Sequence, residues 1–123
     1  MYTIDTNILI YHINGDRKIA RFFLTQFERD ISLFLPTIAV VEFFAFPTVP
    51  PEVRAAFESL LPHFRLVSLD YPLSLAAGKL RSDYRLKLGD SVIAATALAT
   101  GTSLVTRNVR DFKKIPELKI MKV

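Results

Sequence analysis

The stretch that decides the fold is Tyr2-Thr3-Ile4-Asp5-Thr6-Asn7-Ile8-Leu9-Ile10. Residues 1–4 predict a short buried strand, and the polar run over residues 5–7 separates it from a second apolar run over residues 8–11. A carboxylate, a hydroxyl and an amide therefore follow directly on a strand. Because open α/β sheets bind ligands beyond the carboxyl ends of their strands, this position is a candidate site.

Predicted helices and strands alternate through the rest of the chain. A helix is expected over residues 16–28, because Ile19, Phe22, Phe23 and Phe27 recur with helical spacing. The alternation predicts an α/β fold with a parallel sheet covered by helices on both faces. Capping residues, prolines and glycines place the other helices at 37 to about 46, 51–61, 72 to about 86 and 89–100, and the other strands at 31–35, 65–69, 102–106 and 118–123.

The composition narrows both the fold and the chemistry. With 123 residues, half of them hydrophobic, the chain suits one domain over residues 1–123, not a disordered tail or a rod. It contains no cysteine and two histidines, which excludes disulfides, zinc–thiolate sites, cysteine nucleophiles and histidine-rich metal sites. Any bound metal is therefore expected to be a hard ion held by oxygen atoms.

The net charge of +4 is unevenly distributed. Residues 1–60 contain five basic and seven acidic residues, whereas residues 61–123 contain eleven basic and five acidic ones. A basic half suits a polyanion such as nucleic acid, although a solvated lysine-rich surface has the same composition.

No basic leader precedes the first predicted strand, and the most apolar stretch, residues 31–49, is interrupted by Pro36, Glu42 and Pro47. A membrane-spanning helix needs about 20 nearly uninterrupted apolar residues. The expectation is a soluble cytoplasmic protein with no membrane segment.

Five polar side chains are expected near the carboxyl edge of the sheet. Three or four oxygen ligands there would suit an octahedral Mg²⁺ or Mn²⁺ site, and such clusters serve phosphoryl transfer. Alternatively, Asp5 and Asp90 cap helices and Asn108 is a turn residue. The five are Asp5 after the first strand, Glu42 after the second, Asp90 in the helix before the fourth, and Asn108 and Asp111 after the fourth.

Glu42 is the most informative of these residues, because its neighbours over residues 39–46 are almost all apolar. A buried ionised carboxylate costs several kcal/mol unless it is paired or bound to a metal. The alternative to a metal ligand is a core salt bridge with Arg21 or Arg107.

Four segments together resemble the motifs of PIN domains, and more narrowly those of VapC-type toxins. The resemblance spans nearly the whole chain, and the motifs occur in the family's order. The segments are residues 2–10, Leu35-Pro36-Thr37-Ile38-Ala39-Val40-Val41-Glu42, Gly89-Asp90-Ser91-Val92-Ile93-Ala94-Ala95-Thr96-Ala97 and Leu104-Val105-Thr106-Arg107-Asn108-Val109-Arg110-Asp111-Phe112.

The resemblance implies a sheet of order 3-2-1-4-5 and a ribonuclease that cleaves single-stranded RNA, leaving a 5′-phosphate and a 3′-hydroxyl. It implies that Asp5, Glu42 and Asp90 bind Mg²⁺ or Mn²⁺ and that Thr6 and Thr106 orient ligands or water. Where the family often has aspartate, this chain has Asn108, so the fourth ligand and any second metal are open. Asp111 is acidic but lies three residues further on.

The resemblance also implies a homodimer and a cognate antitoxin whose tail occupies the acidic groove. An interface is one interpretation of the aromatic residues Phe22, Phe23, Phe27, Phe43, Phe44 and Phe46, and burial in the core is the other. RNA phosphates are expected to contact basic residues shortly before Asp90, namely Lys79, Arg81, Arg85 and Lys87.

Two rival functions fit parts of the pattern. A haloacid-dehalogenase-like phosphatase needs a second aspartate two residues after its nucleophile, but Asn7 occupies that position here. A catalytically weak PIN scaffold that binds RNA or a protein partner is consistent with Asn108 but not with three retained carboxylates. No serine–histidine pair or glycine-rich phosphate loop offers a further mechanism.

Overall fold

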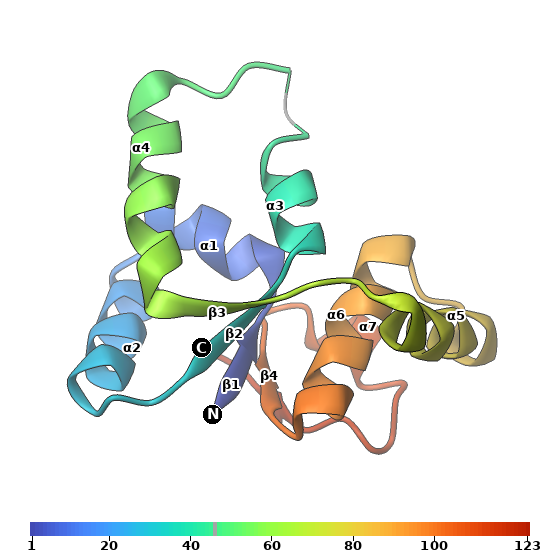
Figure 1. Ribbon diagram of the computed structural model, residues 1–123. Coiled ribbons are helices and arrows are strands. Elements are labelled where there is room, and N and C mark those ends of the chain that lie inside the picture. Colours follow the sequence, from blue (N-terminus) through green and yellow to red (C-terminus); the bar gives the residue numbers. More distant parts are fainter. Residues whose placement is uncertain (46) are drawn as a thin grey trace.

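The computed structural model describes residues 1–45 and 47–123. Its centre is a parallel five-stranded sheet of order β3-β2-β1-β4-β5, of which β1 to β4 are labelled in Figure 1. This fold class and strand order confirm the prediction. The strands are β1 (Tyr2–Ile4), β2 (Leu33–Pro36), β3 (Phe64–Val67), β4 (Ser103–Val105) and β5 (Ile120–Met121).

Helices cover both faces of the sheet (Figure 1). On one face lie α1 (Thr6–Ile13), α2 (Arg17–Glu28) and α4 (Pro51–Leu60), and their core includes Ile8, Phe23 and Phe57. On the other face lie α5 (Tyr71–Tyr84) and α6 (Leu88–Thr100), and their core includes Ile93 and Leu104. Three short helices, α3 (Ile38–Phe43), η1 (Leu61–His63) and α7 (Val109–Phe112), complete the fold. Within the described residues, no helix is long and apolar enough to span a membrane.

Helix α6 is the most deeply buried helix, since every residue from Ser91 to Ala97 is buried. Its small alanine side chains let it lie close to both the sheet and α5, with which it shares the apolar contacts of that face. The helix ends at Gly101, whose φ of 64° lies in the left-handed region that glycine adopts without strain. Because α6 runs antiparallel to β4, its N-terminus lies at the carboxyl edge of the sheet.

The element boundaries differ from the prediction at several points. Strand β2 begins at Leu33, two residues later than expected, and includes Pro36 as its last residue, which pairs with Val67. Strand β1 pairs only as far as Phe34, so no neighbour on that side needs an N–H from Pro36. Helix α3 ends at Phe43, earlier than expected, and the predicted end at Phe46 lies outside the described residues. The predicted strands 65–69, 102–106 and 118–123 are shorter, and β3 begins one residue earlier.

The aromatic residues expected at an interface belong largely to the core. Phe23 and Phe43 are buried, and Phe22, Phe27 and Phe44 pack against the same cluster, so the five described residues form no exposed aromatic patch. The exposed apolar side chains lie elsewhere, and several follow one another from β3 into α5. These are Leu66, Leu69, Tyr71 and Leu75, which are 41–75% exposed.

Candidate functional site

Asp5 and Thr106 meet at the carboxyl edge because they follow the neighbouring strands β1 and β4. The Thr106 hydroxyl donates to Oδ2 of Asp5 over 2.7 Å, and both side chains are buried. The same hydroxyl oxygen accepts the backbone N–H of Asn108 over 2.9 Å. Asp5 occupies the N-cap position of α1 but makes no capping hydrogen bond, so the capping alternative does not account for this carboxylate.

Glu42 is held between α1 and the start of α6. Its Oε1 accepts a hydrogen bond of 2.8 Å from the Thr6 hydroxyl. On its other side lies Gly89, where an added Cβ would come within 2.6 Å of Oε2. Only glycine lets the backbone of α6 approach so closely. The positive end of the α6 dipole also favours a carboxylate here.

The surroundings of Glu42 differ from the expectation. Its helix is not apolar and buried on every side, because Val41 is 63% exposed and Glu42 itself is partly exposed. The alternative of a core salt bridge also fails, since none of the ion pairs among the described residues includes Glu42. Arg107, one of the suggested partners, pairs with Asp16 instead.

Asp90 lies in the first turn of α6, where Lys87 and not Asp90 is the N-cap. Burial raises the pKa of Asp90, and the negative charges of Asp111 and Glu42 add to the rise. Asp111, which lies three residues after Asn108, is thus close enough for its charge to act on Asp90. The Asn108 amide donates to Oδ2 of Asp111 over 2.9 Å and is the main reason why the pKa of Asp111 is lowered.

The electrostatic balance of the site is clearest at Asp5. The pKa of Asp5 is raised from 3.8 to about 6, chiefly by burial and in smaller part by the negative charges of Asp90 and Glu42. The Thr106 hydrogen bond opposes this rise. The negative charges of Asp90 and Glu42 therefore act on Asp5, and that of Glu42 acts on Asp90, a situation that a cation relieves.

The donor set fits a hard divalent cation. Asp5, Glu42 and Asp90 supply carboxylate oxygens, and Thr106 and Thr6 fix the orientation of the first two. In the part of the chain that the structure describes, however, no group of three or more acidic or histidine side chains is already arranged to hold a metal ion. The site thus has the right ligand chemistry, and its carboxylates would have to draw together around a cation.

Of the four basic residues that were expected to contact RNA, one acts on the site carboxylates and three do not. Lys87 is close enough to the site for its charge to lower the pKa values of Asp90 and Asp111. Lys79 forms an ion pair with Asp83 on the exposed side of α5. Arg81 and Arg85 are exposed, and neither is among the groups that act on the site carboxylates.

Two basic residues at the site were missed by the sequence reasoning. Arg110 and Lys114 act on Asp111 together with Lys87, and all three lower its pKa. The signal was present in the sequence, because Arg110 precedes Asp111 directly and Lys114 follows it by three residues, one helical turn.

The close approach at Gly89 yields a test of stability. Gly89→Ala must displace the Glu42 carboxylate from Thr6, whereas Gly78→Ala in α5 meets no atom within 4 Å. In an open helical position alanine is more favourable than glycine by roughly 0.5–1 kcal/mol. We expect urea denaturation to place Gly89→Ala about 1 kcal/mol below Gly78→Ala, since the partly buried hydrogen bond between Thr6 and Glu42 is lost. Equal stability of the two variants would contradict the packing described.

The raised pKa of Asp5 predicts a pH dependence of stability in metal-free buffer. Because the folded-state pKa, about 6, exceeds the ordinary value of 3.8, the folded state binds the proton more tightly. Stability is therefore lost as pH rises from about 4 to 6, by at most about 3 kcal/mol. Asp5→Asn keeps an oxygen acceptor for Thr106 but cannot ionise. The difference in unfolding free energy between wild type and Asp5→Asn, measured in EDTA, should change over this range; parallel curves would refute the burial argument.

Comparison with known proteins identifies the family of this chain. The family model described as PIN domain matches residues 2–118. Ribonuclease VapC10 of Mycobacterium tuberculosis is 30% identical over 124 residues, covering 97% of this chain and 91% of the relative.

Two solved structures extend the comparison. The DNA-bound VapBC2 structure from Rickettsia felis superposes with a TM-score of 0.85 at 21% identity, covering 99% of this chain and 98% of the other. The VapBC-1 structure from nontypeable Haemophilus influenzae superposes with a TM-score of 0.80 at 26% identity, covering 98% and 96%. Because the family model matches nearly the whole chain, this chain belongs to the PIN-domain family.

Proposed function

We propose that this protein is a Mg²⁺- or Mn²⁺-dependent endoribonuclease that cleaves single-stranded RNA, and that it is the toxin of a toxin–antitoxin pair. The observation that carries the proposal is the convergence of Asp5, Glu42 and Asp90 at one sheet edge, where burial and mutual repulsion raise the pKa of Asp5 to about 6. The similarity to a protein named Ribonuclease VapC10 supports RNA as the substrate.

Each residue has a defined part in this proposal. Asp5, Glu42 and Asp90 hold the cation through carboxylate oxygens. Bound Mg²⁺ or Mn²⁺ supplies charge stabilisation at the phosphate and makes water a stronger nucleophile at neutral pH. Thr106 and Thr6 keep one oxygen of Asp5 and of Glu42 in place, so that little reorganisation is needed during reaction. Hydrolysis leaves a 5′-phosphate and a 3′-hydroxyl.

Substrate binding is assigned to the cations beside the carboxylates. The charges of Lys87, Arg110 and Lys114 all act on Asp111, and their positive charge attracts RNA phosphates toward a site that is otherwise acidic. Of the basic residues proposed from the sequence, Lys87 is the best supported. Arg81 and Arg85 are assigned a smaller contribution to RNA binding. Lys79 is assigned none, because it pairs with Asp83 at the surface.

The partners proposed are an antitoxin and a second copy of the chain, acting in the cytoplasm. The relative from H. influenzae was solved as a VapBC-1 complex, which supports an antitoxin. An apolar hollow of about 220 Å³, lined by Ile10, Ile13, Phe43 and Val53 among others, offers it a surface between α1 and α4. The exposed apolar residues from β3 into α5 support a homodimer.

Metal dependence and cleavage are tested together with Asp90→Asn. Saturating Mn²⁺ should raise the melting temperature of the wild type, since a ligand that binds only the folded state stabilises it. Asp90→Asn should lose that increase and the cleavage of a labelled single-stranded RNA, yet remain folded by circular dichroism. Asp83→Asn on the exposed side of α5 is the matched control and should behave as wild type.

If EDTA does not affect cleavage and neither ion changes stability, the proposed function is wrong. RNA binding without cleavage would favour the catalytically weak scaffold.

Asn108 and Asp111 are tested by changing the charge of each. Asn108→Asp replaces the amide that donates to Asp111 with a second carboxylate, so we expect lower stability in EDTA. Mn²⁺ should then stabilise Asn108→Asp more than wild type, with cleavage equal or higher, because the added charge attracts the ion. Asn108→Ala should reduce cleavage only moderately. Should Asp111→Asn abolish cleavage as fully as Asp90→Asn while the fold survives, Asp111 is the missing ligand instead.

A further inference from the structure

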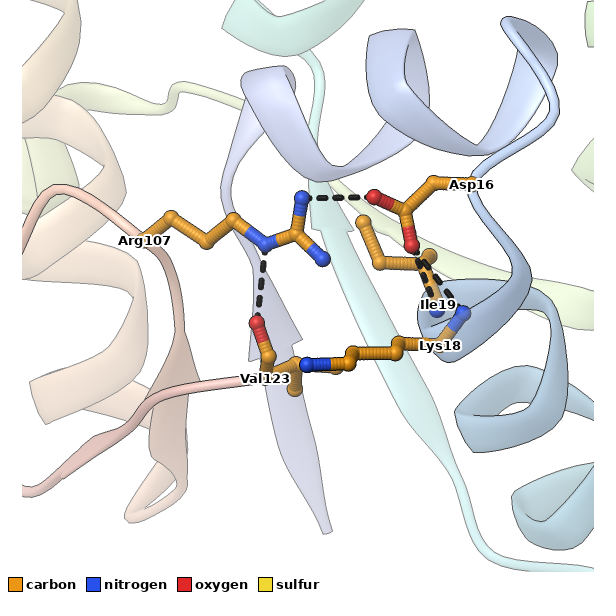
Figure 2. A network of polar contacts seen from close by, with 5 residues as sticks. All are labelled: Asp16, Lys18, Ile19, Arg107 and Val123. Atoms are coloured by element: carbon orange, nitrogen blue, oxygen red, sulfur yellow. Dashed lines mark hydrogen bonds and ion pairs between the residues drawn. The ribbon is translucent and has the colours of Figure 1, made fainter.

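Arg107 joins three segments that are far apart in the sequence, as Figure 2 shows. Its Nη1 donates to Oδ2 of Asp16 over 2.6 Å, and its Nε donates to the backbone carbonyl of Val123 over 2.8 Å. Its guanidinium group also lies over the ring of Tyr11, 4.8 Å from the centroid. The side chains of Arg107 and Asp16 are only about one-quarter exposed, at 26% and 25%.

The partner of Arg107 is itself fixed. The other carboxylate oxygen of Asp16, Oδ1, accepts the backbone N–H groups of Lys18 and Ile19 at the start of α2, over 3.0 and 3.1 Å (Figure 2). Arg107 is therefore anchored to a capped helix end and not to a freely moving side chain.

The contacts of Arg107 lie close to the two segments that form the core of the site. Asp5 directly precedes α1, and Tyr11 and Asp16 lie near the far end of that helix. Thr106, the hydrogen-bond partner of Asp5, is the residue directly before Arg107. Val123 follows β5, the other neighbour of β4. Arg107 thus connects the segment that carries Thr106 to the helix that begins at Asp5.

We propose that Arg107 is a positioning residue of the site. By holding the segment after β4 against α1, it keeps the Thr106 hydroxyl on Asp5 and the Asn108 amide on Thr106. Its consequence for catalysis rests on the proposed ribonuclease function, whereas its consequence for these hydrogen bonds does not. A different role, direct binding of an RNA phosphate, is an outcome of the test.

The chain provides a matched control in Arg54. It too pairs with one carboxylate, Glu58, over 3.1 Å and lies over one aromatic ring, that of Phe44, at 5.2 Å. Both of its partners lie outside the segment after β4. Arg54→Gln therefore removes an ion pair and a cation–aromatic contact, as Arg107→Gln does, without affecting that segment; the bond to the Val123 carbonyl is lost only in Arg107→Gln.

Amide hydrogen exchange, followed by NMR, tests the positioning directly. The backbone N–H of Asn108, which donates to Thr106, should exchange roughly tenfold faster or more in Arg107→Gln and unchanged in Arg54→Gln. The N–H of Asp5, which donates to the Val105 carbonyl over 3.1 Å, serves as a reference within the molecule. Unchanged exchange at Asn108 overturns the proposal, whatever the activity.

Steady-state cleavage of single-stranded RNA then tests the catalytic consequence. We expect Arg107→Gln to lower kcat by roughly tenfold and to leave KM within about twofold, and Arg54→Gln to change neither. In a Thr106→Val background the same Arg107→Gln change should cost less than about twofold, because the hydroxyl it positions is already absent. A full tenfold loss in that background overturns the proposal. A raised KM with unchanged kcat also overturns it and assigns Arg107 to phosphate binding.

The two proposals fail in distinguishable ways. If the wild type neither cleaves RNA nor responds to Mn²⁺, the ribonuclease function is refuted. Faster exchange at Asn108 in Arg107→Gln would then still support the positioning role. Cleavage by the wild type together with unchanged exchange at Asn108 refutes the positioning role alone.

Discussion

The hydrogen bond between Thr106 and Asp5 is the interaction on which the rest of the site depends. It joins the ends of β1 and β4 at the carboxyl edge of the sheet, one residue beyond their last pair, and both side chains are buried. A buried carboxylate without a partner would cost several kcal/mol, and one hydroxyl offsets only part of that cost. The pKa of Asp5 stays raised to about 6, so the folded protein keeps a carboxylate for which a cation would be a favourable partner.

The neighbouring carboxylates, Glu42 and Asp90, are held by contacts of their own. Glu42 is fixed by Thr6 and by the missing side chain of Gly89, and Asp90 lies in the first turn of α6, where the helix dipole favours negative charge. Glu42 and Asp90 are therefore stabilised by different local contacts, while nearby negative charge raises the pKa values of Asp5 and Asp90. Crowding of this kind lowers stability and is typical of functional sites, where a sequence departs from what packing alone would prefer.

The organisation of the fold followed from patterns that are local in the sequence. A single segment shows which of its faces becomes buried. Examples are the helical spacing of Ile19, Phe22, Phe23 and Phe27 and the apolar strand before Asp5. Strand order came from the motif resemblance. Element ends were predicted less well, as at Pro36 and Phe43, because they depend on how far a neighbouring strand or helix extends. Exposure of the aromatic residues was not decided by composition, because whether Phe44 is covered depends on the packing of α4.

By itself, the sequence determined the α/β class, the acidic residues that follow or precede particular strands, and the absence of any sulfur or histidine-rich metal site. These depend on residue type, spacing and chain direction, which the order of amino acids contains. The tertiary structure alone decided that Gly89 packs on Glu42, that Asp111 lies near Asp90, and that Arg107 pairs with Asp16 and not with Glu42. Such pairings join residues up to 91 positions apart, and electrostatic and packing energies depend on distances that exist only once the sheet has brought the segments together.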